Sequence, residues 1–193
     1  MQVTQISDQQ LIALYLDGDE RSFEELLKRH KQKIYTSIYL FVKDTALAED
    51  IFQEVFIKII DTLRKGKYNH EGKFVQWAMR ISYNMCVDYF RRTKRRPKVA
   101  PTETFDIFDV LQVSDDNAEQ RMIKSQTHDK IRHLVDQLPP EQREVVILRH
   151  YADMSFKEIS KLTRVSINTA LGRMRYALIN IRKMVEEREV VLQ

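Results

Sequence analysis

The spacing of the apolar residues constrains the fold of this chain most, since they recur every three or four positions over most of its 193 residues. The clearest run gives one helix an apolar face made of Phe23, Leu26, Leu27, Ile34, Ile38 and Phe41. The alternation typical of β-strands is absent, and the chain has only four glycines and four prolines. This shortage of turn residues argues against β-barrels, β-sandwiches and glycine-rich nucleotide-binding loops. We therefore predict an all-α protein.

Four helices are predicted in residues 1–97, the first of two small helical domains. Asp8 is expected to cap the first helix, and Asp44 or Thr45 the third. An irregular loop rich in turn residues, over residues 63–74, separates the third helix from the fourth. The fourth helix is expected to face inward through Phe74, Ala78, Ile81, Met85 and Tyr89.

The net charge of +4 conceals three blocks of alternating sign. Residues 1–98 hold 18 basic and 13 acidic side chains, a net charge of +5. Residues 99–123 hold one basic and six acidic side chains, a net charge of −5, and residues 124–193 hold 13 basic and nine acidic side chains, a net charge of +4. Six of the basic side chains fall within residues 91–98, which is typical of a polyanion-binding surface, although a solvated helix end has the same composition. Residues 98–123 have no sustained helical pattern, and we interpret them as a flexible acidic linker.

The predicted second domain, residues 124–193, contains a helix-turn-helix. Ser155 and Glu158 have the spacing of a capping box at the start of a short helix, and Ser166 can cap a longer one after a tight turn. The longer helix is expected to face inward through Ile167, Ala170, Met174, Ala177 and Ile181. Its other face carries groups suited to a DNA major groove, namely Asn168, Thr169, Gly172, Arg173, Tyr176, Asn180 and Lys183. An ordinary helical hairpin is the alternative interpretation.

The third predicted helix carries an apolar residue on its outer side as well as an apolar inner face. Ile57 is expected there among Asp50, Gln53, Glu54 and Asp61. Acidic groups around an exposed apolar side chain are typical of a docking surface for a basic, partly apolar partner. A solvated helix face has the same pattern, and spacing alone does not separate the two.

The fourth helix and the loop before it combine aromatic and basic residues in a way that favours single-stranded nucleic acid. One stripe of the helix consists of Trp77, Arg80, Asn84, Asp88 and Arg91. The loop adds Lys65, Lys67, Tyr68, Asn69, His70 and Lys73. Unpaired bases can stack on the rings while the cations follow the phosphates. Trp77 is equally compatible with the core, so Tyr68, in a polar loop, is the better stacking candidate.

Nothing in the sequence indicates catalysis, a metal site or a cofactor. Glu49, Asp50 and Glu54 are candidate acids, but no motif converges with them, and the five histidines lack metal-ligand spacing. Cys86 is the only cysteine, which excludes an internal disulfide. No apolar run approaches the roughly 18 residues of a membrane span, and the N-terminus has no signal pattern, so we expect no membrane insertion and a cytoplasmic location.

Three ordered motifs followed by the helix-turn-helix resemble the extracytoplasmic-function (ECF) sigma factors of bacterial RNA polymerase. The first motif is AEDIFQEVF at residues 48–56. The second is FVQWA at residues 74–78 with Asn84 and DYFRR at residues 88–92, and the third is Leu138-Pro139 with the REV of residues 143–145. The recognition helix departs from the family's usual sequence at Leu171, Gly172, Tyr176 and Leu178, and Arg164 replaces the usual turn glycine.

The resemblance implies a non-enzymatic subunit that binds core RNA polymerase and the −10 and −35 elements of promoter DNA. The matching core-polymerase-binding residues are Asp50, Gln53, Glu54 and Ile57. Those for the −10 element, in the first domain, are Lys67, Tyr68, Asn69, Trp77, Arg80, Asn84, Asp88, Arg91, Arg92 and Arg95. Those for the −35 element, in the second domain, are Ser166, Asn168, Thr169, Gly172, Arg173, Tyr176 and Asn180. An anti-sigma factor is a further implied partner.

Two other functions explain less of the chain. A conventional helix-turn-helix regulator that binds duplex DNA without polymerase accounts for residues 124–193 but gives the surface around Ile57 no role. An enzyme would depend on Glu49, Asp50 and Glu54, which are expected on a helix surface without a second catalytic motif.

Overall fold

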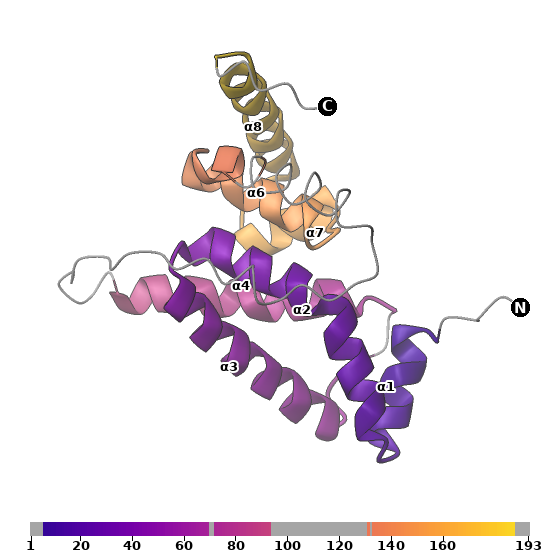
Figure 1. Cartoon of the computed structure of the whole chain (residues 1–193). Helices are drawn as coiled ribbons and strands as arrows, with labels where there is room; N and C mark the ends of the chain where they lie inside the picture. Colours follow the sequence, from indigo (N-terminus) through magenta and orange to yellow (C-terminus); the bar gives the residue numbers. More distant parts are fainter. Residues whose placement is uncertain (1–5, 70–71, 94–130, 132, 188–193) are drawn as a thin grey trace, which may run out of the picture. The chain divides into compact units, whose positions relative to one another are not determined.

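The computed structural model of the chain describes residues 6–69, 72–93, 131 and 133–187, and every regular element among them is a helix (Figure 1). The prediction of an all-α fold is confirmed. The described residues belong to two compact units, the first with helices α1 to α4 and the second with α6 to α8. The predicted linker, residues 98–123, and Arg95 lie outside the described residues, so the limits of the two domains stay a prediction.

Helix α2 (Glu20–Val42) is the centre of the first unit. It packs against α1 (Asp8–Leu16), α3 (Thr45–Arg64) and α4 (Phe74–Thr93). Because three helices cover it, every residue from 34 to 38 is buried, including two polar ones. One of these, Ser37, donates its hydroxyl to the carbonyl of Ile34 at 2.7 Å, and the same hydroxyl lies 3.0 Å from the sulfur of Met79 in α4, so partners in two helices satisfy it.

The caps of α1 and α3 follow the local sequence, with one correction. Ser7, not Asp8, is the N-cap of α1. Its Oγ accepts the backbone N–H of Gln10 at 3.3 Å, and Oε1 of Gln10 accepts the N–H of Ser7 at 2.9 Å. This reciprocal pair satisfies two backbone donors, whereas Asp8 as cap would satisfy one, so the helix starts one residue earlier than a cap at Asp8 requires. Asp44 caps α3 and accepts the N–H of Leu47 at 2.9 Å.

The second unit holds α6 (Pro140–His150), α7 (Phe156–Thr163) and α8 (Ile167–Glu187), with α8 packed against the other two. Ser155 and Glu158 form the predicted capping box at the start of α7. Ser166 accepts the N–H of Thr169 at 3.0 Å at the start of α8. Arg164, the C-cap of α7 and the first of the three residues between the two helices, has the left-handed conformation at φ 58° and ψ 40°. The predicted helix-turn-helix is therefore present as α7, a short turn and α8.

Two helices bury a face that differs from the predicted one. Tyr89 of α4 and Ile167 of α8 are 37% and 44% exposed, although each was expected to face inward. In α4 the buried arc instead includes Tyr83 and Cys86, because the helix packs against both α2 and α3. Only Ala170 and Ala177 are fully buried in α8, so this helix presents a narrow stripe of small residues to its neighbours.

None of the helices within the described ranges is long and apolar enough to cross a membrane.

Candidate functional site

The outer side of α3 has the predicted combination of an apolar residue and acidic neighbours. Ile57 is 66% exposed, while Asp50, Gln53 and Glu54 are exposed around it. We call these four residues the Ile57 surface. Asp61, the fourth expected neighbour, forms a salt bridge with Lys65 one turn further on, and both side chains are more than half exposed, so solvent screens their attraction. The Ile57 surface can accept an apolar side chain flanked by basic groups.

Three aromatic rings hold the loop after α3 against the first turn of α4. The ring centroids of Tyr68 and Trp77 lie 4.4 Å apart, and the ring of Phe74 lies 5.9 Å from Trp77 and 6.3 Å from Tyr68. Phe74 is buried, and the other two rings are half-buried. Tyr68 is therefore packed against Trp77, whereas the sequence placed it alone in a polar loop. The contact hides apolar surface of both rings and fixes the loop relative to α4.

The polar stripe of α4 is exposed along its length. Its exposed side chains are those of Arg80, Asn84, Asp88, Arg91 and Arg92. Lys67 and Asn69, in the loop before α4, are exposed as well. Asp88 and Arg91 lie 3.6 Å apart with side chains more than half exposed, so solvent screens their attraction and leaves both available. Amide and guanidinium groups on one helix face can bind unpaired bases and phosphates together.

The start of α8 presents hydrogen-bonding side chains to solvent. Asn168, Thr169 and Tyr176 are exposed, and Tyr176 reaches 61%. Ser166 uses its hydroxyl for the cap and for a 2.8 Å contact with the hydroxyl of Thr169. Gly172 is half-buried, but a Cβ added there would meet no heavy atom within 4 Å. This end of α8 has the chemistry of a groove-reading helix.

Two of the residues predicted for the same face of α8 instead contact α6. Nη1 of Arg173 lies 3.3 Å from Oε2 of Glu144, with both side chains about a quarter exposed (24% and 23%). The Nδ2 of Asn180 donates to Oε1 of Gln142 at 2.8 Å. Both contacts hold α8 in its orientation on α6. Glu144 and Gln142 are positioning residues that sequence reasoning missed, because their partners lie 29 and 38 residues away.

A further contact anchors the start of α6. Arg143 is half-buried and donates Nη1 to the backbone carbonyl of Asp136 at 3.2 Å. Burial lowers the pKa of the Arg143 guanidinium, and the nearby charge of Asp136 opposes that shift. The arginine next to Glu144 therefore connects α6 to the residues before it, while Glu144 connects α6 to α8.

The described parts of the chain hold no group of three or more His, Cys, Asp or Glu side chains placed to share a metal ion. Cys86 is buried, and burial raises the pKa of its thiol to about 12. A neutral, buried thiol is a poor nucleophile. Glu54 and Asp50, two of the candidate acids, are exposed on α3 as part of the Ile57 surface.

Two family models match the chain, one on each unit. Sigma-70 region 2 matches residues 26–96, and Sigma-70, region 4 matches residues 128–175. The first range includes the Ile57 surface, the aromatic loop and α4. The second includes α6, α7 and the first half of α8.

Three RNA polymerase sigma factors align with most of the chain. The RNA polymerase sigma-H factor of Pseudomonas aeruginosa is 28% identical over 176 residues, which cover 89% of this chain and 90% of that protein. The RNA polymerase sigma factor CarQ of Myxococcus xanthus is 28% identical, and the alignment covers 91% of this chain and 96% of that protein. The ECF RNA polymerase sigma factor SigW of Bacillus subtilis is 26% identical and covers 88% and 92%.

Solved structures share the fold at lower sequence identity. The sigma factor RpoE of Bartonella quintana, in complex with the anti-sigma factor NepR, gives a TM-score of 0.62 at 13% identity and covers 86% of this chain and 98% of that one. CnrH, in complex with the cytosolic domain of CnrY, gives a TM-score of 0.59 at 20% identity and covers 94% and 99%.

Proposed function

This chain belongs to the sigma-70 family of RNA polymerase sigma factors, as a member of the ECF type, and we propose that its two helical units divide promoter recognition between them. The protein binds core RNA polymerase and promoter DNA and directs the initiation of transcription. The observation that carries this function is the presence of both sigma-70 regions, in order, on one chain. A conventional helix-turn-helix regulator accounts for the second region alone and is not favoured.

In this proposal the first unit, within residues 1–97, has two tasks. The Ile57 surface binds core polymerase, because an apolar residue with three polar or acidic neighbours complements a basic, partly apolar surface. The exposed stripe of α4 and the loop before it bind the −10 element as a single strand. Its amides and guanidinium groups contact bases and phosphates, while the packed rings of Tyr68 and Trp77 set the position of the loop.

The second unit, within residues 124–193, binds the −35 element through the start of α8. Asn168, Thr169 and Tyr176 are exposed and approach the bases, and Ser166 and the first turn of α8 approach a phosphate. Arg173 and Asn180 contribute by holding α8 on α6, since their side chains bond to that helix. The predicted acidic linker, residues 98–123, joins the two units.

The proposal gives the protein no catalytic role and places it in the cytoplasm, where core polymerase and the chromosome are found. An anti-sigma factor is the expected regulator. The solved relatives RpoE and CnrH are bound to partner proteins, NepR being an anti-sigma factor, which supports regulation of this kind.

Run-off transcription with purified core polymerase on genomic fragments tests the function. We expect transcripts from particular start sites only when the protein is added. Active core polymerase that gives no protein-dependent transcript on a cognate promoter would contradict the proposal.

A pair of variants tests the Ile57 surface. Ile57→Ser should weaken binding to core polymerase and lower transcription, with little change in thermal stability, because the side chain is 66% exposed. Leu14→Ser, at a position 41% exposed on α1, is the matched control and should keep both activities. Equal effects of the two variants would argue against the Ile57 surface as the polymerase contact.

A further inference from the structure

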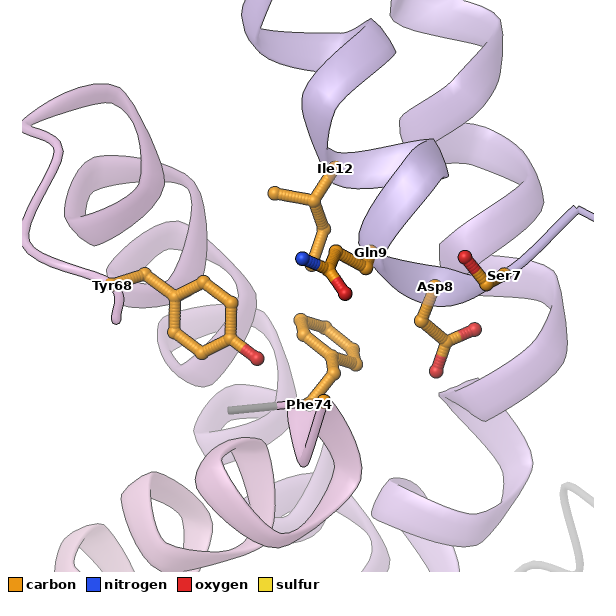
Figure 2. A pocket seen from close by; sticks show the side chains of 7 residues that line it. Ser7, Asp8, Gln9, Ile12, Tyr68 and Phe74 are labelled. Atoms are coloured by element: carbon orange, nitrogen blue, oxygen red, sulfur yellow. The ribbon is translucent and has the colours of Figure 1, made fainter. Parts of the chain in front are cut away.

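A cavity of about 190 Å³ in the first unit lies between α1 and the start of α4 (Figure 2). Asp8 and Gln9 of α1 line one side of it, and Tyr68 and Phe74 line the other. His30 lies 2.7 Å from the Asp8 carboxylate, and its ring centroid lies 5.5 Å from that of Phe74. Because Tyr68 belongs to the surface proposed for the −10 element, the cavity is part of a site already described. A feature without such a role lies in the second unit.

Two apolar side chains are exposed at the start of α8. Ile167 and Leu171 are each 44% exposed, and neither is among the residues proposed for the −35 element. Because they are four positions apart in a helix, their side chains lie one turn apart on the same side. They form an apolar strip at the end of α8 that the proposed function places against DNA.

The basic residue that could read guanine at this end of α8 is already bound to another helix. Arginine and lysine are the usual partners of guanine, whose O6 and N7 both accept hydrogen bonds. Arg173 is the only basic residue within residues 167–174, the first two turns of α8, and its Nη1 lies 3.3 Å from the carboxylate of Glu144. Amide, hydroxyl and apolar groups therefore determine which base pairs this end of the helix accepts.

The exposed groups match an A·T base pair. In the major groove adenine presents an acceptor and an amino donor, which asparagine can bond together, and thymine presents a C5-methyl group, which takes an apolar contact. Asn168 is exposed three residues before Leu171, so the Cβ atoms of the two lie roughly 5–6 Å apart. Base pairs of the duplex are about 3.4 Å apart, so these two side chains can reach the same pair or neighbouring pairs.

We propose that Leu171 determines base specificity by packing against the C5-methyl group of a thymine in the −35 element, next to an adenine bound by Asn168. Ile167 extends the apolar contact by one turn. The neighbouring Gly172 has no side chain, so α8 can approach the groove closely at this point. The inference rests on the proposed function, in which the start of α8 binds the −35 element, and it adds two apolar residues to that surface.

A uracil scan tests the assignment with the full-length protein bound to core polymerase. Uracil replaces one thymine at a time, on either strand of the −35 region of a promoter found by run-off transcription, which removes the methyl group and keeps the base pairing. The dissociation constant is measured at one fixed salt concentration, because phosphate contacts make DNA affinity depend on salt. At one thymine, or at two adjacent ones, uracil should weaken binding about fourfold, the effect of one buried methyl-sized group.

Variants of α8 identify the side chain that contacts the methyl group. In Leu171→Ala, uracil at that position should have no further effect, because the shorter side chain does not reach the methyl group. Leu178→Ala is the matched control and should keep the fourfold loss, since Leu178 is 56% exposed on the same helix but about 10 Å further along its axis. Leu171→Lys should lose the methyl effect and bind a promoter with a G·C pair at that position more tightly than the natural protein does, because lysine donates to guanine.

Three results would overturn the role of Leu171. The first is a −35 region in which no thymine methyl group affects binding, and the second is a fourfold loss that persists in Leu171→Ala. The third is loss of the uracil effect in Leu178→Ala as well, because the effect would then belong to the whole helix rather than to one side chain. Absence of promoter-specific binding by the natural protein with core polymerase would instead overturn the proposed function, and the role of Leu171 with it.

Discussion

Replacing Gly172 by alanine should stabilise the second unit and weaken DNA binding at the same time. Gly172 lies inside α8 with an ordinary helical backbone, and an added Cβ would meet no atom within 4 Å. Alanine therefore fits without strain. The difference in helix propensity is roughly 1 kcal/mol in favour of alanine. For a unit of fewer than a hundred residues, a gain of this size raises the unfolding midpoint by about 4–8 °C.

The opposite effect on DNA follows from the position of Gly172 between exposed Asn168 and Tyr176. If the backbone of α8 approaches the duplex closely at this point, a methyl group separates the two surfaces. Gly172→Leu, with a helix propensity close to that of alanine, should keep most of the stability gain and lose more binding.

Thermal unfolding followed by circular dichroism measures the first effect, and transcription from promoters with intact or scrambled −35 elements measures the second. No rise in the unfolding midpoint would refute the helix-propensity argument. A rise with unchanged dependence on the −35 element, in both variants, would refute the close approach and leave Gly172 without a role in DNA binding.

Three further predictions concern stability and reactivity. Arg164→Gly should raise the free energy of unfolding, measured by urea titration, by about 1 kcal/mol, because Arg164 has φ 58° and only glycine adopts this conformation without cost. A decrease in that free energy would mean that the Arg164 side chain makes a compensating contact. Ser155→Ala should lower the free energy of unfolding by about 1 kcal/mol, because α7 loses its N-cap. Thr163→Ala, at the other end of α7, is the control and should lower it less; an equal decrease in the two variants would contradict the capping argument. Cys86 should resist thiol reagents at pH 8 until the protein unfolds. Because burial raises its pKa to about 12 from 9.0, the folded state binds the proton more tightly, so this contribution to stability is complete below pH 9 and is lost as the pH rises toward 12. A Cys86→Ala variant that loses the same stability between pH 8 and 10 would rule out the thiol as the cause.

Elements that depend on neighbouring residues could be predicted from the sequence. The capping box of Ser155 and Glu158, the cap at Asp44 and the exposed position of Ile57 all follow from spacings of four residues or fewer. The prediction of Asp8 as a cap was wrong by one residue, because Ser7 and Gln10 form a reciprocal pair that a single-residue rule does not anticipate.

The faces that helices bury could be predicted only in part. A stripe of apolar residues indicates which side of a helix is buried, but the width of the buried face depends on how many helices pack against that helix. Helix α2, covered by three neighbours, buries polar residues such as Thr36, while α8 leaves Ile167 exposed. Periodicity alone carries no information on the number of neighbours.

The sequence by itself determined the helices, their caps, the two regions of the family and the residue types available for binding, because these depend on local spacing and on motifs. Only the tertiary structure decided which side chains remain available to a partner. Contacts across 29 residues turned Arg173 toward Glu144, and the packing of α1 and α4 around His30 created a cavity beside Asp8. The physical reason is that salt bridges, ring contacts and cavities form between elements distant in the chain, and their geometry is fixed when the helices pack.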